Sequence, residues 1–439
     1  MVKGILKRLP LNHNFANALM TGYGLMAVTI VIQFVLVPLY LEHLGKEKFG
    51  VLALILAANN FAAIGITWLS GGMARILAER AAVDDIKGFC AGYIFAKWLY
   101  VGYAFLAVFL FWIISPWILG SAYQDPEILH AVILSSLYFI LVYEYNADRA
   151  AYNARHWQAR GNIREAIGQL FFAAGVLWGL HAKWGLPGVV GAQIFGILIT
   201  RILAWLFWKK DNYGLGWSFK LPGFKDLWSR VSGKMGRDYV IYGILLLILQ
   251  ADVLLLGLIA GPEIAATYYL LWRIPEVCIL ILWRIPGSYA PFLIAMDARG
   301  EKAALAENYR RGLLLMIGLA GAAAFIYGIL GPWILKLWVG ENAPTGIIPY
   351  LLAASAMFFF AIARWPAGVA YSLINTTPLI RISFIELITK LMVITFLFST
   401  FGYYTPVLAT TCIHALLIFY LYLWLGKSTV AKSNLAGAC

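Results

Sequence analysis

Long apolar runs, separated by short polar segments, fill almost the whole chain. A helix needs about 20 apolar residues to cross the hydrocarbon layer of a membrane, and each run is at least that long. The pattern predicts twelve transmembrane helices, at residues 15–41, 50–74, 88–115, 127–148, 163–182, 186–208, 238–259, 263–295, 312–334, 346–373, 379–400 and 404–426. Several runs exceed one bilayer thickness, so their helices must tilt, kink or project. The predicted fold class is all-α integral membrane.

Composition supports this interpretation. Of 439 residues, 62% are hydrophobic and 13% are charged, against about 45–50% and 25% in soluble domains. A soluble fold could not keep so much apolar surface from water. The net charge of +13 would suggest nucleic-acid binding only on a soluble domain with a basic face, and none is visible. We therefore expect membrane lipids with anionic headgroups as partners, and no nucleic acid.

Signals for catalysis or metal binding are weak or absent. The four cysteines share no CxxC spacing and three of them lie in apolar stretches, which argues against a disulfide or a metal site. Gly426-Lys427-Ser428 resembles the end of a P-loop, but Leu421 stands where the first glycine is needed and no strand precedes it. We expect no catalytic residue, no metal and no cofactor. Without an ATPase module, transport must draw on an ion gradient, on the solute's own gradient or on a partner.

The basic residues between the runs are distributed unevenly. Of 34 Lys and Arg residues, 25 lie on the side of the N-terminus, 4 lie on the opposite side and 5 fall inside predicted spans. Because basic residues accumulate in cytoplasmic loops, both termini are predicted to be cytoplasmic.

The two halves of the chain resemble each other. Pro-Trp-Ile-Leu occurs at residues 116–119 and again at 332–335, a shift of 216 residues. The same shift brings Gly45 onto Gly261. Six spans in each half keep the same orientation in both, so the repeats should be related by an axis along the membrane normal.

This repeat predicts two pseudo-symmetric six-helix lobes around a central cavity. The N-terminal lobe is residues 1–208 and the C-terminal lobe is 236–439, joined by a basic cytoplasmic linker at 209–235. The architecture places a solute site between the lobes near the midplane of the bilayer.

The first loop carries a family resemblance. Its residues are Pro38-Leu39-Tyr40 and then Leu44-Gly45-Lys46-Glu47-Lys48-Phe49-Gly50. This segment resembles the junction between the first two helices of bacterial polysaccharide-repeat flippases, the Wzx-like branch of the multidrug/oligosaccharidyl-lipid/polysaccharide (MOP) exporter superfamily. The layout of twelve helices, two lobes and a basic middle loop is similar too. The related lipid II flippases carry an Arg in the first helix, where this chain has Asn17, Thr21 and Gln33 as its polar residues.

The resemblance implies a function. Such a protein moves an undecaprenyl-diphosphate-linked oligosaccharide, here a repeat unit of O-antigen type, from the cytoplasmic to the outer leaflet by alternating access. It also implies a multi-pass protein of the bacterial cytoplasmic (inner) membrane. We expect a monomer whose partners are the lipid-linked oligosaccharide and the polysaccharide polymerase and chain-length machinery.

Charges inside the spans mark candidate binding residues, because each costs about 2.5–3.5 kcal/mol at the bilayer centre unless it faces a cavity or a partner. The span 263–295 carries Arg273, Glu276 and Arg284, and Arg364 lies in the span 346–373. Each Arg adjoins a Trp and lies near a Pro. Guanidinium binds phosphate in a fork and indole offers a flat face to sugar rings, so these residues suit a diphosphate-linked glycan. In the alternative, these Arg residues only join helices through ion pairs.

Four further polar residues are candidates for substrate binding. Lys97 shares a helix face with Tyr93 and Tyr100, although an ion pair with an acid on a neighbouring helix would also explain Lys97. Asn60 matches Glu276 under the 216-residue shift and could bind sugar hydroxyls, or join helices by hydrogen bonds.

Embedded acids are candidates for ion coupling. Asp252 and Glu144 lie inside spans, where each could bind the H⁺ or Na⁺ that drives the cycle or pair with a buried Arg. We expect Asp148 to be an interface residue at the cytoplasmic edge. Glu386 and Lys390 are one helical turn apart and are expected to neutralise each other.

Two other functional classes stay open. A membrane polysaccharide polymerase or ligase would need external surface for chemistry, yet the predicted outer loops have at most about a dozen residues between spans. A cation-coupled drug or small-molecule antiporter of the same superfamily should favour buried acids, whereas the spans hold five basic and four acidic residues. That balance favours an anionic ligand.

Overall fold

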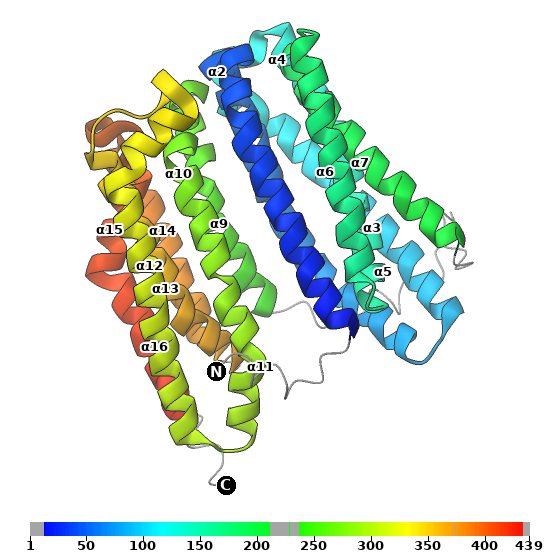
Figure 1. Ribbon diagram of the computed structural model, residues 1–439, viewed down its shortest axis with the longest axis vertical. Coiled ribbons are helices and arrows are strands. Elements are labelled where there is room, and N and C mark those ends of the chain that lie inside the picture. The colour runs from blue at the N-terminus through cyan, green and yellow to red at the C-terminus, as the bar shows by residue number, and fades with distance from the viewer. Residues whose placement is uncertain (1–12, 211–227, 229–236, 374, 433–439) are drawn as a thin grey trace. The chain divides into compact units, whose positions relative to one another are not determined.

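The computed structural model describes residues 13–210, 228, 237–373 and 375–432. These residues are almost entirely helical and include no strand (Figure 1), which confirms the all-α prediction. The chain divides into two compact units, Met1–Gly236 and Arg237–Cys439. Most of the predicted linker, residues 211–227 and 229–235, lies outside the described part of the chain.

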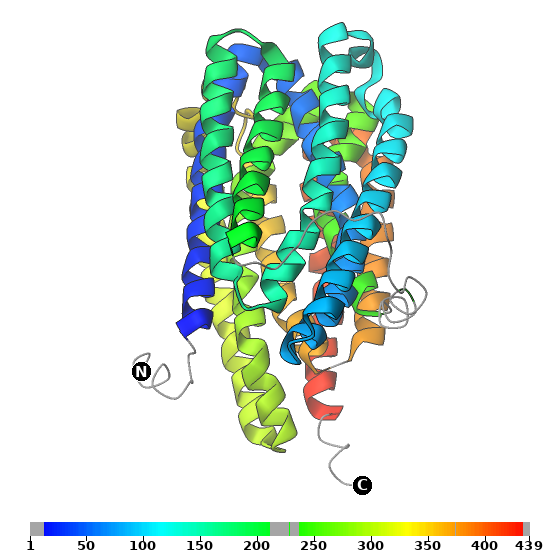
Figure 2. The same cartoon turned by 90° about the vertical axis from the view of Figure 1, so that its right-hand side faces the viewer.

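Unit 1 is a bundle of long helices connected by short turns. Its elements are α2 (His13–Ala82), α3 (Ile86–Leu119), α4 (Pro126–Glu144), α5 (Asn146–Ala154), α6 (Gln158–His181) and α7 (Gly185–Lys210). The helix α6 packs along α7, and α4 packs against both α3 and α7. Figure 2 shows α6 and α7, in shades of green, joined by a tight turn.

Unit 2 has a similar plan with more interruptions. Its elements are α9 (Arg237–Ala260), α10 (Pro262–Leu282), α11 (Arg284–Ala298), α12 (Lys302–Val339), α13 (Ile348–Ser372), α14 (Thr376–Phe401), α15 (Thr405–Ile413), the π-helical turn η4 (His414–Ile418) and α16 (Phe419–Lys432). The helix α13 is the most buried of these and contacts α10, α11, α12, α15 and α16.

Twelve candidate membrane crossings can be counted in the described residues. Nine helical stretches are long and apolar enough to cross a membrane. Two of these, Met20–Ala63 and Thr376–Ala431, hold two crossings each, because the backbone breaks at Gly45 and at Gly402. The helix α9, with the apolar part Leu247–Ala260, supplies one more. The chain is a multi-pass membrane protein.

Equivalent glycines of the two halves adopt the same unusual backbone. Gly45 has φ 78° and ψ 168°, and Gly261 has φ 83° and ψ 178°. Only glycine enters this region readily, because a Cβ atom would clash with the backbone. The two glycines that correspond at a shift of 216 residues therefore also have the same local backbone conformation.

One end of unit 1 is held together by Glu127, in the first turn of α4. Asp125 caps this helix by accepting a hydrogen bond from the Glu127 N–H at 2.8 Å. The Glu127 side chain ion-pairs with Lys48 of α2 and accepts a hydrogen bond from the Leu186 N–H of α7 at 2.8 Å. Three helices are thereby joined where their backbone groups would otherwise lack partners.

The predicted span 263–295 is not one continuous helix. The helix α10 ends at Leu282, and α11 begins at Arg284. Pro286 explains the break, because it has no N–H for the carbonyl group of Leu282 and its ring clashes with that carbonyl.

Candidate functional site

Unit 1 contains four charged side chains that lie together, which we call the Lys97 cluster: Lys97 of α3, Glu144 of α4, Asp148 of α5 and Arg201 of α7. Lys97 ion-pairs with Glu144, and its Nζ lies 3.4 Å from Asp148 Oδ2. Arg201 Nη2 lies 2.6 Å from Glu144 Oε2. Two cations therefore compensate two carboxylates, as buried charges require.

Asp148 is a buried member of this cluster, so the prediction that it is an interface residue is wrong. The Tyr93 hydroxyl donates to Asp148 Oδ1 at 2.8 Å, and the Trp208 indole N–H donates to the same atom at 3.0 Å. The reason is local. The helix α4 ends at Glu144, and α5 starts a new short helix whose inner face carries Asp148.

The other candidates in unit 1 differ in how deeply their side chains are buried. Tyr93, Lys97 and Tyr100 are all buried. Lys97 pairs with Glu144 on a neighbouring helix, which is the ion-pair alternative for this residue. Asn60 is exposed on α2, apart from the buried side chains.

In unit 2, Asp252 of α9 is paired with Lys390 of α14. Lys390 Nζ donates to Asp252 Oδ2 at 2.8 Å and to the Ile248 carbonyl oxygen at 2.8 Å. The Tyr268 hydroxyl also donates to Asp252 Oδ2, at 2.6 Å. The expectation that Glu386 neutralises Lys390 is therefore wrong, because Lys390 finds its acid on a different helix.

Glu386 is the centre of another buried group, which we call the Glu386 cluster: Arg364 of α13, Ser383 and Glu386 of α14, His414 of η4 and Tyr422 of α16. Glu386 Oε1 lies 3.5 Å from Arg364 Nη2 and 3.3 Å from His414 Nε2. Glu386 Oε2 accepts a hydrogen bond from the Tyr422 hydroxyl at 2.8 Å. Ser383 Oγ lies 3.1 Å from that hydroxyl. Arg364 is 4% exposed and Glu386 is 0% exposed.

Arg273 and Glu276 are paired along α10. Arg273 Nη1 lies 2.7 Å from Glu276 Oε2, and the Gln250 amide of α9 donates to Glu276 Oε1 at 3.0 Å. These charges are less buried than those of the Glu386 cluster, since the two side chains are 14% and 12% exposed. Arg284, at the first position of α11, is half-buried.

Several buried N–H donors on α10, α13 and the residue between α10 and α11 have no acceptor within the described part of the chain. We call them the donor set: Trp272 Nε1, Arg273 Nε, Trp283 Nε1, Arg364 Nε and Arg364 Nη1. The Arg364 guanidinium also stacks on Phe360, with its Cζ 4.0 Å from the ring centroid. A buried donor without an acceptor costs about 1–3 kcal/mol, so a ligand that brings acceptor oxygens to these atoms would relieve that cost.

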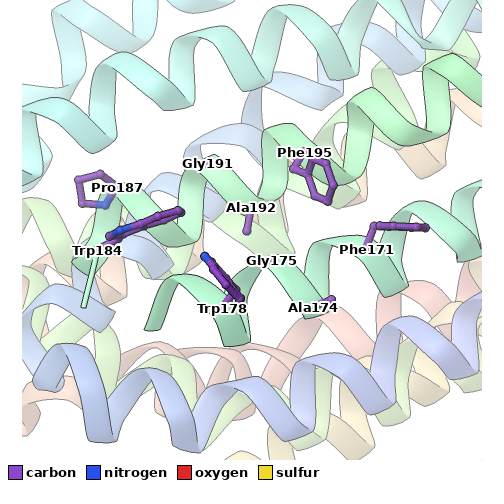
Figure 3. Close-up of a pocket in the computed structure, with 10 residues that line it drawn as sticks. Phe171, Ala174, Gly175, Trp178, Trp184, Pro187, Gly191, Ala192 and Phe195 are labelled. Carbon is purple, nitrogen blue, oxygen red and sulfur yellow. The ribbon is translucent and has the colours of Figure 1, made fainter. Parts of the chain in front are cut away.

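An apolar cavity of about 730 Å³ lies between α6 and α7 of unit 1 (Figure 3). Trp178 and Trp184 lie at one part of its wall, and Phe171 and Phe195 at another. No charged side chain lines it. It therefore offers no cation to a phosphate group, unlike the donor set.

Some members of these clusters were missed in the sequence. Arg201 counts there only as one of the cytoplasmic basic residues, and His414 only as one of six scattered histidines. A usable signal existed for His414, because an ionisable residue inside an apolar span is a functional candidate by default. Among the described residues, no group of three His, Cys, Asp or Glu side chains is placed to hold a metal ion.

Comparison with known proteins identifies the fold. No protein-family profile and no curated protein sequence matches the chain. Solved structures do match, among them a multidrug resistance MATE family transporter of the MOP superfamily in its inward-facing conformation, at 12% identity and a TM-score of 0.77, covering 94% of this chain and 96% of that one. The lipid II flippase MurJ, in an inward closed conformation, matches at 12% identity and a TM-score of 0.63, covering 95% and 90%.

These neighbours are transporters and flippases rather than enzymes. At such low identity they show the fold alone. The chain has the all-helical fold of MOP-superfamily membrane transporters.

Proposed function

We propose that the chain is a flippase for an undecaprenyl-diphosphate-linked oligosaccharide repeat unit of O-antigen type. It carries this lipid from the cytoplasmic to the outer leaflet of a bacterial inner membrane by alternating access, as a monomer with both termini in the cytoplasm. A polysaccharide polymerase with its chain-length machinery would then receive the product. In this proposal Arg273 and Arg364 bind the diphosphate.

The donor set is the observation that carries the proposal. Its five N–H groups on neighbouring elements of unit 2 lack acceptors in the described chain. Phosphate oxygens accept from guanidinium groups in a fork, and hydroxyl or ring oxygens of sugars accept from indole N–H groups. An anionic glycolipid headgroup therefore supplies what these side chains lack.

The ion pairs of the buried acids also support an anionic ligand. Each acid in the two units' buried clusters has a basic partner within 4 Å: Glu144, Asp148, Asp252, Glu276 and Glu386. A cationic drug would have to displace a buried Lys or Arg from its carboxylate. This favours an anionic ligand over the cation-coupled antiporter alternative.

The remaining candidates keep secondary parts in the proposal. Arg284, Glu276, Lys97, Tyr93, Tyr100 and Asn60 are proposed to contact the headgroup or its sugars. Asp252 and Glu144 are proposed to couple an ion, H⁺ or Na⁺, to the cycle. Because both acids are ion-paired with lysine, an incoming cation would have to compete with that lysine.

The test is reconstitution in liposomes that contain undecaprenyl-diphosphate-linked glycans of defined composition. Flipping is read as the fraction of glycan that becomes accessible to an external glycosidase. Arg273→Ala and Arg364→Ala should each reduce the rate about tenfold or more, because a hydrogen bond to a charged group contributes about 1.5–3 kcal/mol.

The matched control is Arg310→Ala, also in unit 2. Arg310 pairs with Glu307 but its side chain is 71% exposed, so flipping should stay at the wild-type rate. Full activity of both Arg273→Ala and Arg364→Ala, in protein that is folded, would refute the site. Transport of an organic cation in place of the glycolipid would favour the antiporter.

A further inference from the structure

The His414 ring is held in a defined orientation inside unit 2. Its Nδ1 atom lies 2.9 Å from the Thr410 carbonyl oxygen. A carbonyl oxygen only accepts hydrogen bonds, so Nδ1 must carry the proton. In a neutral ring Nε2 is then an acceptor. His414 also starts the π-helical turn η4, and such turns occur frequently at functional sites.

This orientation brings the second ring nitrogen close to a carboxylate, with no hydrogen bond between them in the described structure. His414 Nε2 lies 3.3 Å from Glu386 Oε1, and both residues are 0% exposed. Two buried acceptors facing each other without a proton would repel, and no water competes for them at this depth. One proton held between Nε2 and Oε1 removes the conflict, either as imidazolium with carboxylate or as neutral imidazole with carboxylic acid.

The other groups around Glu386 do not occupy the space between His414 Nε2 and Glu386 Oε1, where the shared proton would lie. The Tyr422 hydroxyl of α16 occupies the other oxygen of Glu386, and Ser383 of α14 bonds to that hydroxyl. Arg364 of α13 faces Oε1 at 3.5 Å. Lys390 follows one turn along α14 but is bound to Asp252 of α9.

The protonation state of Glu386 and His414 affects the ion pair between Glu386 and Arg364. In the structure the contact between Glu386 and Arg364 is long, at 3.5 Å, and Arg364 Nε and Nη1 have no acceptor in the described residues. With the proton present, His414 would compensate the charge of Glu386, which fits this long contact. Without the proton, the Glu386 carboxylate faces a neutral imidazole. Since Lys390 is paired with Asp252, Arg364 is then the cation that remains for Glu386 among the described residues around it. The guanidinium would be drawn to Glu386 and lost to a ligand.

We propose that Glu386 and His414 form a proton-binding site, and that one shared proton frees Arg364 to bind an anionic phosphate group. The second half rests on the proposed function, because it uses Arg364 as a ligand of the diphosphate. Binding of the proton and of the anion is then mutually favourable, and by linkage each raises the affinity for the other by the same factor.

The first experiment counts protons on the purified full chain without any ligand. Proton release is titrated between about pH 5 and pH 8, where histidine exchanges its proton, for wild type, Glu386→Gln, His414→Asn and the double variant. The Asn side chain can still donate to the Thr410 carbonyl. Each single variant should release one proton fewer than wild type, and the double variant also only one fewer, because both residues hold the same proton.

His43 provides the matched control. Its Nδ1 lies 3.0 Å from the carbonyl oxygen of Leu39, four residues earlier, as in His414, but the ring is exposed. His43→Gln combined with Glu386→Gln should therefore lose two protons. Loss of two protons in the Glu386→Gln, His414→Asn double variant would show independent titration and overturn the shared site.

The second experiment uses inorganic pyrophosphate, and its main measurement is made on wild-type protein, so that measurement does not depend on the folding of a variant. Calorimetry in buffers of different ionisation enthalpy should show proton uptake on binding, and the affinity should rise by up to about tenfold per pH unit of acidification. In Glu386→Gln, the affinity for pyrophosphate should change with pH only as far as the ligand's own ionisation requires.

The two experiments separate the two proposals. Pyrophosphate binding without proton uptake in wild type would overturn the linkage and leave the proposed function standing. A shared proton without pyrophosphate binding would keep the proton site, overturn its link to a ligand and count against the proposed function.

Discussion

The ammonium group of Lys390 lies 2.8 Å from the carboxylate of Asp252, although the two residues are 138 positions apart in the sequence. The pair joins α9 to α14 inside unit 2, and both side chains are buried. Neither charge is compensated by a neighbour on its own helix. The pair therefore acts as one unit in the energetics of the fold.

We expect removal of one partner to cost more than removal of both. Lys390→Ala leaves a buried carboxylate without a cation, which should lower the free energy of unfolding by about 3–5 kcal/mol. The double variant Asp252→Asn, Lys390→Gln keeps polar groups of similar size without charges and should lose much less. Thermal unfolding of the purified chain in detergent measures both, and a larger loss in the double variant than in Lys390→Ala would show that the charges do not depend on each other.

The backbone conformation at Gly45 and Gly261 predicts how Gly→Ala variants change the free energy of unfolding. Gly45→Ala and Gly261→Ala place a Cβ atom where only glycine fits, at φ values of 78° and 83°, so each should cost about 1–3 kcal/mol. Gly102 of α3 is the control, because a Cβ atom there would meet no atom within 4 Å. Gly102→Ala should be neutral, or should stabilise by up to about 1 kcal/mol through helix propensity. Thermal unfolding distinguishes the two outcomes.

The helical type of the elements could be predicted from the sequence, because it depends on local patterns. Runs of apolar residues determine which segments become helices, and the match of Gly45 to Gly261 indicates where equivalent breaks occur. The break after Leu282 was missed, since the run stays apolar across it and only Pro286 marks it.

The pairing of buried charges could not be predicted in the same way. Helical spacing showed that Glu386 and Lys390 share a face, but it does not show what a neighbouring helix presents to that face. In the structure Glu386 forms an ion pair with Arg364, and Lys390 forms one with Asp252. Those partners depend on packing between helices that are distant in the sequence, about which one sequence carries little information.

Asp85 predicts a local pH dependence at the start of α3, outside the membrane-spanning part of that helix. The Gly88 backbone N–H, and then Arg80, lower the pKa of Asp85 below its ordinary value of 3.8. The ionised cap therefore contributes stability in full above that ordinary value. The contribution is lost as the pH falls through the lower pKa of the folded state.

We expect the protection of the amide hydrogens in the first turn of α3, taken relative to their intrinsic exchange rates, to fall below about pH 4, because the cap loses its charge. Hydrogen exchange followed by mass spectrometry measures this. Asp85→Asn should remove most of the pH dependence. Asp84→Asn is the neighbouring control, since the Asp84 side chain is 90% exposed, and it should behave as wild type. An unchanged pH dependence in Asp85→Asn would rule out the cap as its source.

Two tryptophans of unit 2 differ in a way that separates binding from stability. Trp365 Nε1 donates to the Tyr309 carbonyl oxygen at 2.9 Å, whereas Trp283 Nε1 is buried without an acceptor in the described chain. Trp→Phe removes the N–H group and keeps an aromatic ring in both cases. Trp365→Phe should lower the free energy of unfolding by about 0.5–1.5 kcal/mol more than Trp283→Phe, because it removes a hydrogen bond that Trp283 does not make.

Transport should show the opposite order. If Trp283 keeps its N–H for a sugar or phosphate oxygen, Trp283→Phe should slow glycolipid flipping several-fold, while Trp365→Phe should slow it only as far as it reduces the amount of folded protein. Flipping rates per folded molecule, together with thermal unfolding of the same preparations, test both statements. Equal flipping by the two variants would mean that the Trp283 donor is not used by the ligand. The donor set would then be reduced to its three remaining side chains, Trp272, Arg273 and Arg364.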